Sequence, residues 1–390
     1  HRDLHSFPTR RSSDLKFSDL KEDTEMIDAE KIKKLVRPSI AAMPAYVPGR
    51  TVEEASKANG GIKMIKLGSN ESQIGPSPMA VKAMADIAAS TNTYPNPVAG
   101  DLGEALADYY GVEPGNIVCG NGSSTILDAI CRAYVNQGEE VLFCMPSFQI
   151  YQMFTEEMDG VSVVLPLDKD LKFDLNAMKE KITDKTKLIM ICNPNNPTGS
   201  FLNSRELSDF IKSLPSHVIC VIDEAYIEYA TDPECASMIP LINDYNVIVV
   251  RTFSKIWGLA GARVGYAVAN EEIAKYIRSC VCTFNVNKMV IAGAIASLQD
   301  KDFLQKSWEI NKEGKEYLSE EMKKFGWHVW PTQSNFIYVT ETTMDAADIA
   351  REMEKRGIII RGNMGFLRIT IGTMEQNKKM IAAFKDMLGM

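Results

Sequence analysis

The chain has 390 residues, 45% of them hydrophobic and 24% charged, which is typical of a folded globular protein with two domains and not of a disordered chain. The net charge of −8 argues against a general nucleic-acid-binding surface, which requires a basic excess. No stretch approaches the roughly 18 consecutive apolar residues of a membrane span. Any phosphate chemistry must therefore depend on local arginines and backbone amides.

The eight cysteines indicate a reducing compartment, because several lie within apolar runs where a reduced thiol behaves as a small hydrophobe. The only close pair is Cys280 and Cys282, and the chain has four histidines, so no zinc-type ligand spacing is present. The N-terminus lacks the apolar core of a signal peptide. The sequence predicts a cytoplasmic protein without a metal site.

The N-terminal residues 1–25 are expected to be a non-native or disordered leader. They begin without methionine, and the stretch up to about Leu15 resembles translated adapter sequence, so Met26 is the expected native start. Residues 26–64 are predicted to form an arm and a first helix that packs on a small C-terminal domain.

Seven short apolar stretches alternate with helix-length segments in the middle of the chain. They are 117–120, 141–145, 161–167, 187–193, 218–223, 246–252 and 263–269. Continuous Val and Ile residues indicate strands that are buried on both faces, as in a mostly parallel sheet covered by helices. The sequence therefore predicts an α/β large domain over residues 65–285, with ligands beyond the carboxyl ends of its strands.

The C-terminal third has a different pattern, which predicts a smaller α+β domain over residues 286–390. The predicted helices are 287–325, 344–356 and 374–388, and the predicted strands are 327–330, 336–340, 358–361 and 367–371. Thr373 and Gln376 have the spacing of a capping box, which is expected to begin the last helix.

Lys255 follows an apolar stretch in the segment Thr252-Phe-Ser-Lys255-Ile-Trp-Gly258, and Arg263 lies eight residues further on. A lysine amine that is protonated in water cannot form an imine, so it must be desolvated or placed near other cations. A solvated lysine at a strand end is the ordinary alternative. With Ser254 and Arg263 available for a phosphate, the segment indicates a lysine that holds an aldehyde cofactor.

The segment Gly120-Asn-Gly122-Ser123 follows the first predicted strand and begins a helix. Free N–H groups and the positive end of the helix dipole favour a phosphate there. Thr125 stands where a dinucleotide fingerprint requires a third glycine, which argues against a nicotinamide dehydrogenase. A well-capped helix without a ligand is the alternative for this motif.

Two further polar residues follow later strands. Asn196 is a candidate donor to a cofactor hydroxyl, although Asn, Pro and Gly dominate turns in any case. Asp223 ends an apolar stretch, where a carboxylate is costly unless it meets a cation or a donor. A protonated pyridine nitrogen would satisfy it, and backbone amides are the alternative partners. All these segments follow strands of one sheet, so they are expected to form one site.

The chain from about residue 60 resembles the fold-type-I pyridoxal-phosphate-dependent aminotransferases, and within them it is most similar to the histidinol-phosphate aminotransferases. The resemblance rests on Tyr94 to Pro97, Gly120 to Ser123, Pro146 to Phe148, Asn193 to Gly199, Asp223 to Tyr226, Thr252 to Arg263, Asn335-Phe336 and Leu367 to Gly372. It implies a large domain with a mostly parallel seven-stranded sheet and a smaller α+β domain.

The resemblance also implies the cofactor, pyridoxal 5′-phosphate, and the residues around its ring. Lys255 joins the cofactor covalently and later shuttles a proton. Phe148 stacks on the ring, a role to which an aromatic face is suited. Asp223 pairs with the ring nitrogen, while Asn196 and Tyr226 donate hydrogen bonds to the phenolic oxygen.

The cofactor phosphate has its own implied ligands. They are the amides of Gly122 and Ser123, the side chains of Ser254 and Arg263, and Tyr94, which reaches in from a neighbouring subunit. The resemblance therefore implies a homodimer with active sites at the subunit interface.

The substrate residues implied by the resemblance are Arg361, Arg368 and Asn70. A guanidinium group binds a carboxylate or a phosphate through two hydrogen bonds, so the same arginines could serve histidinol phosphate and glutamate. Ser72 and Gln73 stand where the family usually has Asn-Pro, in the loop that faces the substrate.

The implied reaction converts histidinol phosphate and 2-oxoglutarate to imidazole acetol phosphate and glutamate, a step of histidine biosynthesis. An aromatic or broad-specificity aminotransferase and a threonine-phosphate-decarboxylase-like lyase are the alternatives within the fold. A cofactor-binding transcription regulator would need a DNA-binding domain, for which residues 26–60 are too short. The expected partners are small amines and 2-oxo acids, without nucleic acid or membrane.

Overall fold

The computed structural model describes residues 28–43, 50–363 and 365–390. The chain divides into two compact units, His1–Pro44 and Ala45–Met390. The helices described in the first unit are α1 (Ala29–Lys33) and α2 (Pro38–Ala42). The predicted leader, Met26 and residues 44–49 of the predicted arm lie outside the described residues.

The second unit contains a seven-stranded sheet in the order β2-β8-β7-β6-β5-β3-β4. Its strands are β2 (Ile117–Gly120), β3 (Glu140–Met145), β4 (Val161–Pro166), β5 (Thr186–Cys192), β6 (Ile219–Asp223), β7 (Val247–Thr252) and β8 (Gly265–Ala269). Neighbouring strands are parallel except at β8, which is antiparallel to both β2 and β7. The predicted mostly parallel α/β sheet is confirmed.

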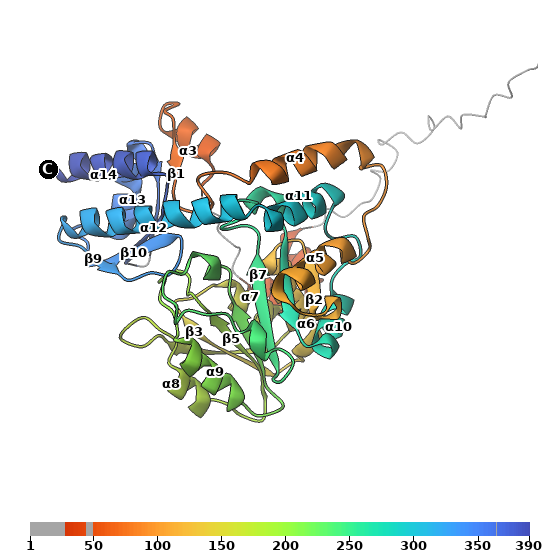
Figure 1. Cartoon of the computed structure of the whole chain (residues 1–390). Coiled ribbons are helices and arrows are strands. Elements are labelled where there is room, and N and C mark those ends of the chain that lie inside the picture. The colour runs from red at the N-terminus through yellow and green to blue at the C-terminus, as the bar shows by residue number, and fades with distance from the viewer. Residues whose placement is uncertain (1–27, 44–49, 364) are drawn as a thin grey trace, which may run out of the picture. The chain divides into compact units, whose positions relative to one another are not determined.

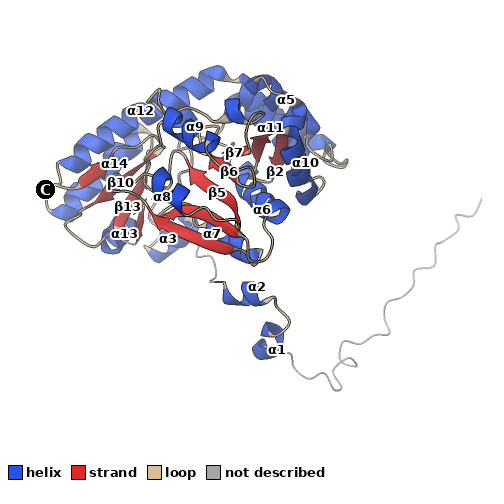
Figure 2. Ribbon diagram, turned by 90° about the horizontal axis from the view of Figure 1, so that it is seen from below, coloured by secondary structure: helices blue, strands red, loops and turns tan. Residues whose placement is uncertain are grey.

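Helices surround this sheet, whose strands lie in the interior (Figures 1 and 2). They are α4 (Pro78–Ile87), α5 (Gly100–Tyr110), α6 (Ser123–Tyr134), α7 (Ile150–Glu157), α8 (Leu175–Glu180), α9 (Ser204–Lys212), α10 (Glu271–Cys280) and α11 (Lys288–Gln299). Short 3-10 helices lie at Ala88–Ser90, Pro114–Asn116, Ile227–Tyr229, Ile239–Leu241 and Ala260–Ala262. The Val and Ile side chains of the central strands β5, β6 and β7 are buried, since helices cover both faces.

A second, four-stranded antiparallel sheet has the order β12-β13-β10-β9. Its strands are β9 (His328–Trp330), β10 (Phe336–Thr340), β12 (Arg361–Asn363) and β13 (Phe366–Thr370). Nearby, β1 (Ile65–Lys66) pairs in parallel with β11 (Ile358–Ile359). The accompanying helices are α3 (Val52–Ala58), α12 (Lys301–Lys323), α13 (Ala346–Lys355) and α14 (Met374–Leu388). This part has a separate hydrophobic core.

Two predicted elements of the C-terminal third are each divided in the structure. The predicted helix 287–325 is two helices, α11 and α12, because the Asp300 side chain caps a new first turn. The predicted strand 358–361 is β11 and β12, which pair with different partners. The predicted capping box of α14 is confirmed by reciprocal hydrogen bonds between Thr373 and Gln376.

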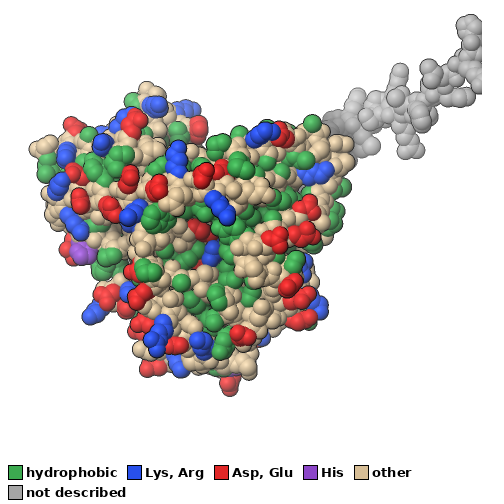
Figure 3. Space-filling model, in the orientation of Figure 1, with side chains coloured by type: hydrophobic (Ala, Val, Ile, Leu, Met, Phe, Trp, Pro, Cys, Tyr) green, Lys and Arg blue, Asp and Glu red, His purple; other side chains and the backbone are tan. Residues whose placement is uncertain are grey.

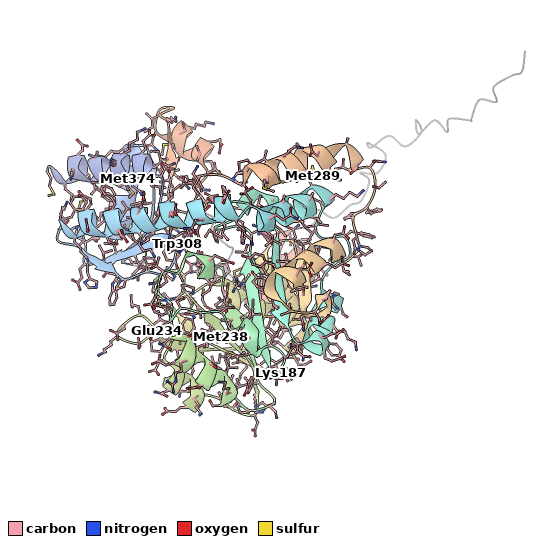
Figure 4. The ribbon with its side chains drawn as sticks, in the orientation of Figure 1. Lys187, Glu234, Met238, Met289, Trp308 and Met374 are labelled. Carbon is pink, nitrogen blue, oxygen red and sulfur yellow. The ribbon has the colours of Figure 1, made fainter. Side chains whose placement is uncertain are left out.

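The long helix α12 runs between the helices of the small sheet and those of the large sheet. It extends from beside α14 towards α11 in Figure 1. Trp308, labelled in Figure 4, donates from Nε1 to the carbonyl of Ala230 (3.1 Å), in the segment that follows β6. The predicted domain boundary between residues 285 and 286 stays a prediction. Strand β1, which precedes this boundary in the chain, pairs with β11, which follows it.

Acidic and basic side chains are interspersed over the face shown in Figure 3. Within the described part of the chain, every helix is too short or too polar to cross a bilayer.

Candidate cofactor and substrate site

The predicted site segments meet at one edge of the large sheet. Strands β2, β5, β6 and β7 run in the same direction, so their carboxyl ends lie together. Asp223 is the last residue of β6, and the segments that follow the other three strands supply a turn before α6, the Asn-Pro-rich loop and Lys255. Ligands of open α/β sheets bind at this edge.

The turn between β2 and α6 forms an anion cradle. Gly122 has φ 85°, which favours glycine, and among the described residues no side chain caps the first turn of α6. The first N–H groups of the helix are therefore available to an anion. A Cβ at position 122 would collide with Nη2 of Arg263. Only glycine lets this guanidinium lie against the turn.

Ser254 and Arg263 complete the cradle. Arg263 Nη1 donates to Ser254 Oγ (3.4 Å) and to the carbonyl of Ala260 (3.1 Å). Ser254 Oγ also accepts from Thr252 Oγ1 (2.9 Å), which fixes the serine side chain. Serine, arginine and helix start are thus brought together at one place, as a phosphate ligand set requires.

Lys255 lies in a mostly buried position, with Nζ 5.4 Å from the ring centroid of Tyr226. Burial, together with the charge of Arg368, lowers the pKa of the Lys255 amine to about 8. Glu71 and Asp223 act in the opposite direction. A lower pKa gives more neutral amine near neutral pH, which a nucleophile or a general base requires.

Asp223 is 3% exposed and has two hydrogen-bond donors. Oδ2 accepts from Tyr151 Oη (2.9 Å), and Oδ1 accepts from the Ala225 N–H (3.1 Å). Burial raises the pKa of this carboxyl to about 6, although both hydrogen bonds and Lys255 lower it. A buried carboxylate in this condition is stabilised by a cationic partner.

Asn196 and Tyr226 are oriented by bonds that use their acceptor atoms. Asn196 Oδ1 accepts from Arg368 Nη1 (2.7 Å), which leaves the Nδ2 protons directed elsewhere. Tyr226 Oη accepts from Asn70 Nδ2 (3.1 Å), so this hydrogen bond does not use the Tyr226 hydroxyl proton. Burial raises the pKa of Tyr226, which keeps the phenol protonated. Both residues are therefore donors.

Arg361 and Arg368 form a cationic pair on the small sheet. They are directly opposite each other in the antiparallel register of β12 and β13, so their side chains lie on the same face. Arg368 is held by its bonds to Asn196 and to the carbonyl of Gly68 (2.8 Å). Like charges opposite each other are unfavourable unless an anion lies between them. The pair is therefore suited to an anionic substrate.

Asn70 ties the substrate-facing loop to the small sheet. It is fully buried with φ 55°, its N–H donates to Thr370 Oγ1 (2.9 Å), and its carbonyl accepts from Asn335 Nδ2 (3.1 Å). Further along the loop, Gln73 Oε1 accepts from Gln376 Nε2 (3.1 Å) at the start of α14. The residue that departs from the usual family pattern is thus itself anchored.

The two aromatic residues predicted to contact the cofactor, Phe148 and Tyr94, differ from each other in their burial. Phe148 is half-buried and contacts Tyr151 edge to face, with centroids 5.8 Å apart. Tyr94 is 79% exposed and stacks on Phe284 (4.6 Å). Tyr94 therefore lies on the surface of the single chain, and its predicted role across a subunit interface stays a prediction.

Sequence reasoning did not find Tyr151, Thr252 or Glu71. Tyr151 has the appearance of a core aromatic residue, and its only signal is its place one helical turn after Phe148. Thr252 lies within the quoted lysine segment, where its hydroxyl had no predicted role. Glu71 forms an ion pair with Lys66 (3.1 Å), and its charge acts on the Lys255 amine.

Comparison with known proteins agrees with this geometry. The family model of aminotransferase class I and II matches residues 62–384. The histidinol-phosphate aminotransferase of Moorella thermoacetica is 38% identical to this chain, over 90% of the chain and 92% of that protein. Histidinol-phosphate aminotransferase 2 of Carboxydothermus hydrogenoformans is 37% identical, over 91% of the chain and 99% of that protein.

A solved structure gives the same result for the fold. It is histidinol-phosphate aminotransferase from Sinorhizobium meliloti in complex with pyridoxal-5′-phosphate, which superimposes with a TM-score of 0.83. The two sequences are 28% identical, and the match covers 91% of this chain and 97% of that chain.

Proposed function

The chain belongs to the class I and II aminotransferases, and we propose that it uses pyridoxal 5′-phosphate to transfer the amino group of histidinol phosphate to 2-oxoglutarate. The products would be imidazole acetol phosphate and glutamate, in histidine biosynthesis. The observation that supports this most is a mostly buried lysine of lowered pKa beside an anion cradle and a buried carboxylate.

The residues present fit this cofactor, which has an aldehyde, a phosphate and a basic ring nitrogen. Lys255 supplies an amine for the aldehyde, and Asp223 supplies a carboxylate for a protonated ring nitrogen. The start of α6, with Ser254 and Arg263, fits a phosphate in both charge and hydrogen bonding. When bound, the cofactor supplies an electron sink for negative charge at the substrate carbon.

The residues of the chain have distinct tasks in this reaction. Lys255 Nζ, in its neutral form, removes the proton from the substrate carbon and later returns it. Asp223 keeps its negative charge against the ring nitrogen, while Asn196 and Tyr226 donate to the phenolic oxygen. Phe148 supports one face of the ring. The desolvated position of Lys255 keeps its amine reactive near neutral pH.

The substrate is recognised through its anionic end in this proposal. Arg361 and Arg368, side by side on the small sheet, bind the phosphate of histidinol phosphate in one half-reaction and a carboxylate of glutamate in the other. Because Arg368 is also bonded to Asn196, it connects the substrate end to the cofactor end.

Arg361→Ala is expected to raise KM for histidinol phosphate by about 10- to 100-fold with little change in kcat, since a lost charge-assisted hydrogen bond costs roughly 1.5–3 kcal/mol. Cofactor content should stay unchanged. Arg351→Ala is the matched control, because Arg351 is an exposed helix residue that, within the described residues, forms an ion pair with Asp348 on the surface of α13. Equal KM values in the two variants would remove Arg361 from the substrate site.

A single-turnover experiment tests the choice of substrate. The holoenzyme, mixed with histidinol phosphate without a 2-oxo acid, should convert its cofactor stoichiometrically to the amine form. Conversion with aromatic amino acids but not with histidinol phosphate would favour the broader aminotransferase. Release of carbon dioxide from threonine phosphate would favour the lyase.

We also propose a cytoplasmic homodimer with Tyr94 contributing to the partner's site. Tyr94, Val98 and Phe284 form an exposed apolar patch, tied together by the Tyr94–Phe284 stack and by the Phe284 N–H bond to Pro97 (2.8 Å). All eight cysteines are free thiols, as in a reducing compartment. Light scattering that finds a fully active single chain would contradict the dimer.

A further inference from the structure

Tyr151, in α7, contacts two residues of the proposed cofactor site at once. Its side chain is fully buried. Its hydroxyl donates to Asp223 Oδ2 (2.9 Å), and its ring edge packs on Phe148 with an interplanar angle of 85°. Its ring also contacts Phe143 of β3, with ring centroids 6.2 Å apart. One side chain thus supports both the carboxylate and the phenyl ring proposed to hold the cofactor ring.

We propose that Tyr151 is a positioning residue for the cofactor ring. Its hydroxyl orients the Asp223 carboxylate and stabilises the charged form, and its ring supports Phe148. This inference rests on the proposed function, because it assigns Tyr151 to the same site. It adds a residue beneath the two groups that would contact the ring directly.

The hydroxyl of Tyr151 is a permanent donor. Burial raises its pKa well above the ordinary value, and the charge of Asp223 raises it further, so the phenol stays protonated over the working range of pH. With Ala225 on the other oxygen, both carboxylate oxygens of Asp223 have a fixed donor. Each oxygen keeps a further lone pair for the ring nitrogen.

The other charged and polar groups around Asp223 also affect whether its carboxyl is charged. Glu224 raises the pKa of the carboxyl, while Lys255 lowers it. Cys192, at the end of β5, and Tyr226 are neutral, because burial raises the pKa of each. Burial raises the pKa of Asp223, and the Tyr151 hydrogen bond is the largest of the interactions that lower it.

Tyr151→Phe removes the hydroxyl and keeps the ring against Phe148. In the holoenzyme, the dissociation constant of the cofactor is measured against pH by absorbance. Affinity should decrease on the acidic side as Asp223 takes up a proton. The midpoint of that decrease should lie about one pH unit higher in the variant, because a hydrogen bond to the charged form has been lost.

Tyr266→Phe is the matched control. Tyr266 is also fully buried, and its hydroxyl is bonded to that of Tyr110 (2.6 Å) and not to Asp223. Its removal should lower stability without moving the midpoint. An unchanged midpoint in Tyr151→Phe, or an equal change in both variants, overturns the role of Tyr151.

A second replacement covers the case in which Tyr151→Phe does not fold. A fluorinated tyrosine at position 151 keeps the shape and makes the hydroxyl a stronger donor, so the midpoint should move to lower pH. An unchanged midpoint would also overturn the proposal. The proposed function is tested separately in the same preparation. If wild-type protein does not attach the cofactor at Lys255, the proposed function is wrong. If the cofactor is attached but the pH midpoints of the variants do not move, only the proposed role of Tyr151 is wrong.

Discussion

Lys255→Ala is expected to abolish covalent attachment of the cofactor and to lower turnover by about 10⁴-fold or more, since the nucleophile and the general base are lost together. The protein should still fold, because removing a desolvated amine relieves an unfavourable burial. Absorbance of the bound cofactor and steady-state rates measure the two effects.

Lys315→Ala is the control for this substitution. Burial lowers the pKa of the Lys315 amine to about 8, as at Lys255, but Lys315 lies on α12 and donates to the carbonyl of Thr332 (3.1 Å). The control should keep its cofactor and its turnover. Activity retained in Lys255→Ala would contradict the catalytic role of Lys255. Activity lost equally in Lys315→Ala would show that burial of a lysine and not its position accounts for the result.

Asp223→Asn is expected to lower turnover by about 10²- to 10⁴-fold, the range found when one preorganised charged or acid–base partner is removed. In the wild type, cofactor affinity should decrease as pH falls through about 6, since the carboxyl then loses the charge that pairs with the ring nitrogen. The variant should bind the cofactor weakly at every pH. A pH titration of cofactor binding compares the two proteins.

The same substitution should stabilise the protein without cofactor at neutral pH. The pKa of Asp223 is about 6 in the fold and 3.8 ordinarily, so the folded state binds the proton more tightly. Its ionisation therefore destabilises the fold increasingly between about pH 4 and pH 6, and fully above that range. The difference corresponds to about 3 kcal/mol, which Asp223→Asn should gain at pH 7 and not near pH 4.

Chemical denaturation of both cofactor-free proteins at the two pH values measures this difference. Equal free energies of unfolding at pH 7 would mean that Asp223 is not strained by its burial. A stability gain with a loss of function is the expected signature of a residue kept for its chemistry.

The large sheet could be predicted because most of its strands are continuous apolar stretches that are buried on both faces. The predicted burial is wrong for β4, which lies at the edge of the sheet and leaves Val161 and Val164 exposed. The polar residues that follow the strands could be placed at one edge, since parallel strands share a direction. The division of the stretch from Ile358 to Arg361 could not be predicted. All its positions suit a strand, and only the tertiary partners β1 and β13 separate its two halves.

The contacts within the site were less accessible to sequence reasoning. Arg361 and Arg368 were predicted as single residues, but their placement on one face depends on the register between β12 and β13. The hydrogen bond from Tyr151 to Asp223 joins residues 72 positions apart, and no local pattern reports such a distance. Gln73, a departure from the family pattern, acquires its partner Gln376 only in the folded chain.

The most direct test is to reduce the holoenzyme with borohydride and map the labelled peptide. A single label on Lys255, absent after preincubation with histidinol phosphate, is the result expected if this amine holds the cofactor and the substrate displaces it. A label on another side chain, or none, would contradict the assignment of the site and the proposed reaction together.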